Sequence, residues 1–115
     1  MTAFEITQLE RAWWQRRAAA ELASILDAHR DLPCIAWTVG PAGSVLAGQV
    51  SGLAPAARVR GVFTAWREAL ALTEDPGQQM SGGTTWLHAA ARRHQVTVRL
   101  TATVFDDNDG PEAGQ

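Results

Sequence analysis

The chain has 115 residues, the length of one domain that can bury a hydrophobic core without disulfides or a structural metal. It carries ten basic and twelve acidic residues, but four of the acids lie after position 105, at Asp106, Asp107, Asp109 and Glu112. The remainder is close to neutral, which argues against a strongly basic surface for nucleic acid or for an anionic membrane.

The amino-acid composition also indicates the source of the protein and its location in the cell. All ten basic residues are arginines, and alanine and glycine are frequent, which is typical of a GC-rich coding sequence such as an actinobacterial one. The lone Cys34 has no partner for a disulfide within the chain, and no apolar run approaches the roughly 20 residues that span a bilayer. The first residues also lack the apolar segment of a secretory signal. We therefore expect a bacterial, cytoplasmic protein without a membrane association.

The first segment, residues 5–29, has the spacing of an amphipathic helix. Its apolar residues recur every three or four positions: Ile6, Leu9, Trp13, Ala20, Leu22, Ala23, Ile25 and Leu26. Asp31 and Pro33 predict where this helix ends, because helical geometry is disfavoured just before a proline. Arg17 and Glu21 have the spacing of a local ion pair along the helix.

Residues 34–39 and 44–50 are two predicted strands, and the glycines and proline of residues 40–43 supply the backbone angles of a tight reversal. The core-facing residues predicted for this hairpin alternate along each strand: Ile35, Trp37, Val39, Leu46, Gly48 and Val50. Val45 and Ala47 are also apolar, so the pattern leaves the facing of the second strand open. A glycine in this set indicates a bulge or a close approach to the backbone at position 48.

A second helix is predicted after Pro55, because proline suits the first turn of a helix. Its apolar residues fall on one stripe, made of Val59, Val62, Phe63, Trp66 and Leu70. The Glu-Asp-Pro-Gly segment at 74–77 ends this pattern, and a polar, glycine-bearing connection through residues 81–83 leads into the last hairpin.

The last hairpin, residues 86–105, has two chemically different faces. Along its second strand, apolar residues alternate with polar ones at strand period. The inward set is Val96, Val98, Leu100, Ala102 and Val104, and the outward set is Thr97, Arg99, Thr101 and Thr103. On the partner strand, Trp86 and His88 are predicted to share the outward side.

Together these patterns predict an α+β fold. We expect a two-layer sandwich in the order α-β-β-α-β-β, with a four-stranded, mainly antiparallel sheet and both helices on one face. Residues 1–105 are expected to form this single domain, and residues 106–115 an acidic, flexible C-terminal tail. The opposite face of the sheet is then uncovered in a monomer.

The five tryptophans divide into two groups. Trp13, Trp37 and Trp66 lie on predicted core stripes, and packing explains them best because a buried indole removes about 150–250 Å² from water. Trp14 diverges by about 100° from its helix neighbour Trp13, and Trp86 alternates out of phase with the apolar residues of its strand. We expect at least one of these two at a surface or an interface.

The leading hypothesis is a small interaction or regulatory module, for which we do not favour an enzymatic activity. It acts through the exposed sheet face or through the helix edge that carries Trp14. Its expected partner is a second copy of itself, in a homodimer, or another protein. The predicted partner-binding residues are Trp14, Trp86, His88, Arg92, Arg93, Arg99 and Thr101.

The alternative hypothesis is a nucleic-acid-binding module. In it, Trp86 and His88 contact bases, and the cluster of Arg92, Arg93 and Arg99 contacts phosphates. The near-neutral charge of the chain and its lack of the paired aromatic motifs of RNA-recognition sheets make this hypothesis the less favoured one.

The sequence gives only weak indications of a catalytic nucleophile or a metal site. Cys34 with a histidine as its base would make a nucleophile, but a single cysteine at the start of a strand is more often a small buried residue. The histidines and Cys34 lack the spacing of a zinc site, and the acidic run 106–110 fails the register of a calcium loop. We expect no metal and no cofactor.

Overall fold

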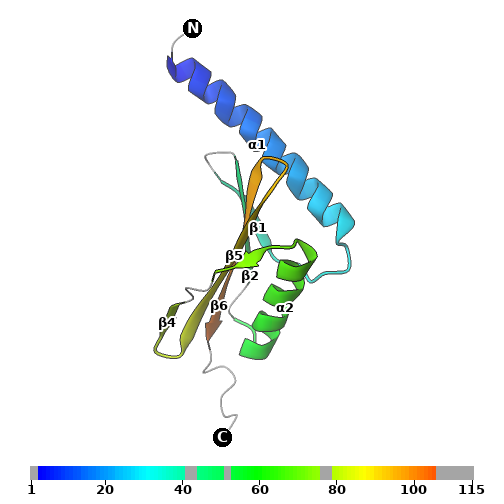
Figure 1. Cartoon of the computed structure of the whole chain (residues 1–115), viewed down its shortest axis with the longest axis vertical. Helices are drawn as coiled ribbons and strands as arrows, with labels where there is room; N and C mark the ends of the chain where they lie inside the picture. The colour runs from blue at the N-terminus through cyan, green and yellow to red at the C-terminus, as the bar shows by residue number, and fades with distance from the viewer. Residues whose placement is uncertain (1–2, 41–43, 51–52, 76–78, 106–115) are drawn as a thin grey trace, which may run out of the picture.

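The structure is a computed structural model that describes residues 3–40, 44–50, 53–75 and 79–105, without the side chains of residues 3–7 and 79–81. The predicted acidic tail, residues 106–115, lies outside the described residues. The elements in chain order are α1 (Ala3–Ala28), β1 (Ala36–Val39), β2 (Val45–Val50), α2 (Ala56–Ala69), β3 (Thr73–Glu74), β4 (Gln79–Ser81), β5 (Thr84–Arg93) and β6 (Val96–Phe105). The N-terminal part of α1 projects beyond the sheet (Figure 1).

The α+β class is confirmed, with two helices and one sheet, but the predicted four-stranded, mainly antiparallel sheet is wrong in its details. The sheet is mixed and has six strands in the described residues, in the spatial order β1-β2-β6-β5-β3, with β4 paired to β5. The pairs β1–β2 and β5–β6 are antiparallel hairpins, as predicted. β2 and β6 run parallel, with Leu46 beside Val98 and Gly48 beside Leu100.

The parallel pair follows from the long connection between β2 and β6. A connection of a dozen or more residues can return the chain in its original direction, whereas a tight turn cannot. α2 belongs to this connection and packs against β6 and β2, the two strands that it helps to join. The two unpredicted strands, β3 and β4, are short and have no apolar alternation, so only their pairing with β5 defines them.

The sheet has one buried face and one open face. Pairing aligns the inward residues of neighbouring strands in rows, such as Leu46, Val98 and Ala91. The predicted inward set of β6 is buried and forms one core with residues of α1 and α2. Both helices therefore cover the same face, and the described part of the chain leaves the other face open.

A tryptophan pair fixes α2 to the first hairpin. Trp66 is buried, and its indole N–H donates a hydrogen bond to the carbonyl oxygen of Pro33 at 2.8 Å. Trp37 packs edge-on against Trp66, with ring centroids 5.6 Å apart. Gly48 lies opposite Trp37 on β2, and a Cβ atom there would lie 2.9 Å from the Trp37 ring. The close approach expected at Gly48 is therefore the approach of this indole.

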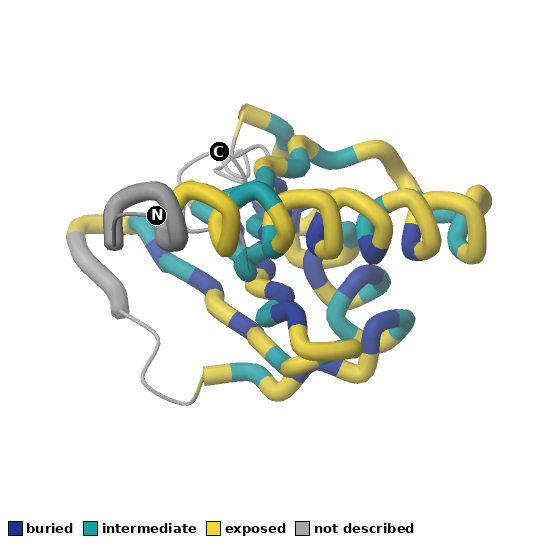
Figure 2. The backbone as a smooth tube through the Cα atoms, turned by 90° about the horizontal axis from the view of Figure 1, so that it is seen from above, coloured by how far each residue is buried: buried dark blue, intermediate teal, exposed yellow. Residues whose placement is uncertain are grey.

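α1 is buried along only part of its length (Figure 2). Ala18, Glu21 and Ile25 are buried and define the side of α1 that faces the sheet. Trp14 lies four residues before Ala18 and continues this side, whereas Trp13 lies off it and is 48% exposed. The prediction that Trp13 is a core residue is wrong. The many alanines of α1 fit its buried side and its exposed side equally well, so the sequence pattern does not indicate which side of the helix faces the core.

The tip of the β5–β6 hairpin holds the C-terminal part of α1. The carboxylate of Glu21 accepts a hydrogen bond from Arg93 Nε at 3.1 Å and contacts His94 Nδ1 at 2.7 Å. Arg17 Nε donates to the carbonyl oxygen of His94 at 3.2 Å. Glu21 is thus paired with the hairpin, and the predicted local pair with Arg17 is wrong.

Candidate functional site

The outer face is the side of the sheet away from the two helices. Its side chains come from every second position of β2, β5 and β6: Val45, Ala47, Gln49, Trp86, His88, Ala90, Arg92, Thr97, Arg99, Thr101 and Thr103. Five of the predicted partner-binding residues therefore share this face, namely Trp86, His88, Arg92, Arg99 and Thr101. The strand alternation that predicted their common side is what brings them together.

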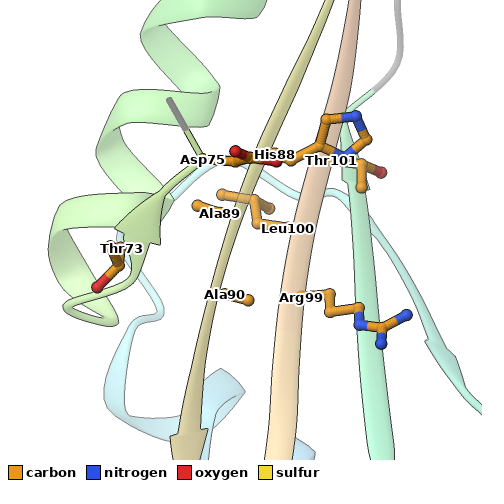
Figure 3. Close-up of a pocket in the computed structure, with 8 residues that line it drawn as sticks. All are labelled: Thr73, Asp75, His88, Ala89, Ala90, Arg99, Leu100 and Thr101. Atoms are coloured by element: carbon orange, nitrogen blue, oxygen red, sulfur yellow. The ribbon is translucent and has the colours of Figure 1, made fainter. Parts of the chain in front are cut away.

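A hollow of about 340 Å³ lies in the middle of the outer face (Figure 3). It is lined by Thr73, Asp75, His88, Ala89, Ala90, Arg99, Leu100 and Thr101. His88 and Thr101 are register partners across β5 and β6, and Ala90 and Arg99 are partners in the adjacent register position on this face. The backbone N–H of Asp75 donates to the carbonyl oxygen of His88 at 2.8 Å and closes the β3 side of the hollow.

Arg99 lies at the centre of the outer face, and the residues paired with it on the two neighbouring strands are small. Ala47 on β2 and Ala90 on β5 are its register partners, so methyl groups flank it on both sides. Its side chain reaches toward β2 (Figure 3), and it forms no hydrogen bond or ion pair with the described part of the chain. A guanidinium with five N–H donors and no protein partner is a strong site for a carboxylate or a phosphate.

The other polar residues of the face lie on either side of the Arg99 row. Arg92 Nη1 donates to Thr97 Oγ1 at 3.3 Å, and His88 is exposed beside the half-buried Thr101. Trp86 lies two positions before His88 on β5 and is also half-buried. The face therefore offers cationic and hydroxyl donors in its centre and an indole toward one end.

Arg93 does not share this face, although the sequence predicted it as part of one basic cluster. It follows Arg92 on β5 and so points to the helix side, where it pairs with Glu21. Burial by itself raises the pKa of Glu21, but the hydrogen bonds and charges of His94 and Arg93 outweigh burial and hold this pKa below its ordinary value. Arg93 thus contacts α1 within its own chain.

Trp14, the remaining predicted partner-binding residue, lies on α1, away from the outer face. It is half-buried and packs edge-on against Trp13, with ring centroids 4.7 Å apart. The guanidinium carbon of Arg17 lies 5.7 Å from the centroid of Trp13. Trp13 is the more exposed indole of the two, and sequence reasoning missed it because it assigned Trp13 to the core.

Thr73 and Asp75, which line one side of the hollow, were also missed. They belong to β3 and the residue after it, in a segment that the sequence indicates only as a connection. A two-residue strand leaves no periodicity to detect.

The structure does not group the residues that the sequence suggested for a nucleophile or for a metal site, within the part of the chain that it describes. Cys34 is exposed, so the prediction of a buried thiol is wrong. Within the described residues, no three His, Cys, Asp or Glu side chains are grouped so that they could hold a metal ion. Neither described helix is both long and apolar enough to cross a membrane.

Comparison of the chain with protein-family models, with curated proteins and with solved structures finds no match in any of the three.

Proposed function

We propose that this protein is a small interaction module whose outer face binds an acidic segment of another protein. The observation that carries the proposal is Arg99, which lies between two alanines on a sheet face that the described residues leave uncovered and whose guanidinium pairs with none of those residues. A carboxylate can accept two parallel hydrogen bonds from a guanidinium, and arginine is suited to this planar contact.

The Arg99 side of the hollow fits an acidic residue of a peptide segment, whereas the carboxylate of Asp75 on the β3 side favours a neutral or basic residue of that segment there. The exposed imidazole of His88 and the hydroxyl of Thr101 lie in the adjacent register position on this face and offer further hydrogen bonds to a carboxylate or a peptide group. Trp86 offers an indole to an apolar residue of the same segment, and such aromatic residues are frequent anchors in protein interfaces. The hollow of about 340 Å³ has room for a few side chains.

The structure weakens the support for nucleic acid as the ligand. Tracking a phosphate backbone takes several cations, and binding gains from each one that is added. Arg93 and His94 both contact Glu21, on the helix side of the sheet, so the arginines of the outer hairpin face are Arg92 and Arg99. Two arginines suit one or two carboxylates better than a run of phosphates.

A binding titration with Arg99→Gln tests the proposal. The probe is a fluorescently labelled glutamate-rich peptide with one leucine, and fluorescence anisotropy reports its binding. We expect Arg99→Gln to weaken binding about tenfold or more, because a charge-assisted contact contributes about 1.5–3 kcal/mol. Arg58→Gln is the matched control, since exposed Arg58 belongs to α2 on the other side of the sheet.

Two outcomes would overturn the proposal. One is equal affinity of the wild type and Arg99→Gln for the peptide. The other is no peptide binding together with salt-sensitive binding of a labelled single-stranded oligonucleotide, which would support the nucleic-acid hypothesis.

A further inference from the structure

The half of the outer face that lies over β2 and β6 carries a single charged residue, Arg99, in the part of the chain that the structure describes. The others are uncharged, namely Val45, Ala47, Gln49, Phe105 and the threonines of β6. The Arg99 side chain reaches toward β2 (Figure 3). The carboxylate of Asp75 lies beyond β5, on the β3 side of the hollow. An acidic segment over β2 and β6 would therefore meet Arg99 and no carboxylate of the described residues.

The sequence that follows β6 is strongly acidic. Residues 106–112, here called the acidic segment, hold four carboxylates and no basic side chain. They lie outside the described residues, but the strand from which they continue is described. Phe105, the last residue of β6, has the strand parity of Thr103 and Arg99, so the acidic segment begins at one end of the β6 row that carries Arg99. Opposite charge and this starting point make the acidic segment a candidate ligand of Arg99.

We infer that the acidic segment folds back over β2 and β6 and that Glu112 places its carboxylate on the guanidinium of Arg99. The inference rests on the proposed function, because it takes Arg99 as a carboxylate site, and it adds a regulation of that site. The chain holds its own competitor, linked to the face at an effective concentration of about millimolar. A partner segment binds only if its acidic residues displace Glu112, which excludes weakly acidic sequences.

The length of the acidic segment decides which carboxylate reaches Arg99. Arg99 lies six positions before Phe105, a distance of about 20 Å along a strand. A chain extends at most about 3.3–3.6 Å per residue, so Glu112, seven positions after Phe105, can lie up to about 23–25 Å from it. This length covers the distance and leaves room for the reversal, and the two long side chains add reach. Asp107, two positions after Phe105, extends to about 7 Å and stops far short of Arg99.

A second carboxylate of the acidic segment meets the face nearer to the end of β6. Asp109 lies four positions after the last residue of β6 and Thr101 four positions before it, so an extended segment brings the two level. The Thr101 hydroxyl and the side-chain amide of Gln49, its register partner on β2, are hydrogen-bond donors for this carboxylate. Pro111 favours a polyproline II conformation, in which residues three positions apart, such as Asp109 and Glu112, point to the same side. Both acids can therefore face the sheet together.

Neutralising these two acids tests the inference. The variant Asp109→Asn/Glu112→Gln removes both carboxylates from the full chain and changes no residue of the described fold. ¹⁵N spectra recorded without any peptide compare this variant with the wild type. We expect the Arg99 Nε–H signal and the backbone amide signal of Thr101 to shift, because the guanidinium and the hydroxyl lose their acceptors.

The matched control is Asp106→Asn/Asp107→Asn. It removes the same charge from the same acidic segment, at positions too close to Phe105 to reach Arg99. Its spectrum should keep the wild-type signals of Arg99 and Thr101. The control thereby separates a contact of the acidic segment from a general effect of net charge.

The glutamate-rich peptide provides a second readout. We expect Asp109→Asn/Glu112→Gln to bind this peptide about threefold or more tighter than the wild type does, because the linked competitor is gone. The control variant should bind the peptide with nearly the wild-type affinity.

Signals of Arg99 and Thr101 that stay the same in Asp109→Asn/Glu112→Gln, or that shift equally in the control, overturn the inference. A difference from the wild type that disappears on dilution overturns it as well, since the acidic segment of a second copy then occupies the face. Peptide binding that depends on Arg99 but is equal in the wild type and both variants also overturns it, while the proposed function stands. Shifts at Arg99 without peptide binding to any variant support the contact within the chain and count against the proposed function alone.

Discussion

Gly48 shows how one missing side chain shapes the core. A Cβ atom at this position would lie 2.9 Å from the Trp37 ring and 3.1 Å from Ile35. Because Trp37 packs on Trp66, the ring has little freedom to move aside. We expect Gly48→Ala to lower the free energy of unfolding by about 1–3 kcal/mol, the usual cost of overpacking.

Urea unfolding followed by tryptophan fluorescence measures this loss. Gly61→Ala is the matched control, because Gly61 lies within α2 and a Cβ there meets no atom within 4 Å. The control should gain about 0.5–1 kcal/mol, since alanine favours a helix over glycine. Equal stability of Gly48→Ala and the wild type would show that the Trp37 contact is misplaced.

Glu21 makes the attachment of α1 depend on pH. Its pKa is lower in the folded chain than its ordinary value, so ionised Glu21 stabilises the fold above the ordinary pKa, and this contribution is lost as pH falls through the lowered pKa. Glu21→Gln removes this carboxylate. We expect the variant to be about 1–3 kcal/mol less stable at neutral pH, from broken contacts to Arg93 and His94.

Urea titrations at a series of pH values from 7 downward measure the difference between wild type and Glu21→Gln. The difference should shrink at acid pH, where Glu21 of the wild type becomes protonated. A difference that is constant over this range would falsify the proposed ionic attachment.

At the scale of elements, the turn between β5 and β6 is a strained two-residue reversal. His94 and Gln95 have positive φ angles of 50° and 72°, a geometry that glycine or asparagine adopts more easily. The Gln95 side chain forms no hydrogen bond or ion pair with the described part of the chain, unlike His94, so it can be removed. We expect Gln95→Gly to raise the free energy of unfolding by about 0.4–1 kcal/mol.

The turn between β4 and β5 supplies the opposite control. Gly82 and Gly83 have φ angles of 56° and 83° there. Gly82→Ala should lower stability, although a Cβ at Gly82 meets no atom within 4 Å, because the loss comes from backbone strain alone. Thermal unfolding compares both variants, and a gain in both or a loss in both would contradict the assignment of these turns.

The sequence pattern predicted those elements that pair with their neighbours along the chain. The two hairpins and the apolar stripe of α2 follow from strand and helix periods together with turn residues. The parallel contact of β2 and β6 joins residues about fifty positions apart, for which no local pattern exists. The side of α1 that faces the sheet was not predictable for another reason. Alanine occupies both its buried side, at Ala18, and its exposed side, at Ala20.

At the scale of the whole molecule, strand alternation in the sequence was enough to predict which side chains of β5 and β6 share the outer face. Trp86, His88, Arg99 and Thr101 share the outer face for that reason. Arg93 was predicted to join them in one basic cluster, but its contact with Glu21 places it on the helix side of the sheet. Trp14 was predicted on a separate surface, a helix edge, and it lies on α1. Contacts between distant elements, such as Glu21 with the hairpin tip, are set by packing and have no counterpart in the local sequence.

We propose the outer face of the sheet as the binding surface. Backbone amide NMR spectra of the ¹⁵N-labelled protein, recorded while the glutamate-rich peptide is added, test it most directly. We expect shifts concentrated on β5 and β6 around His88, Arg99 and Thr101, with α2 unchanged. Shifts confined to α1 or α2, or a spectrum that the peptide leaves unchanged at millimolar concentration, would contradict it.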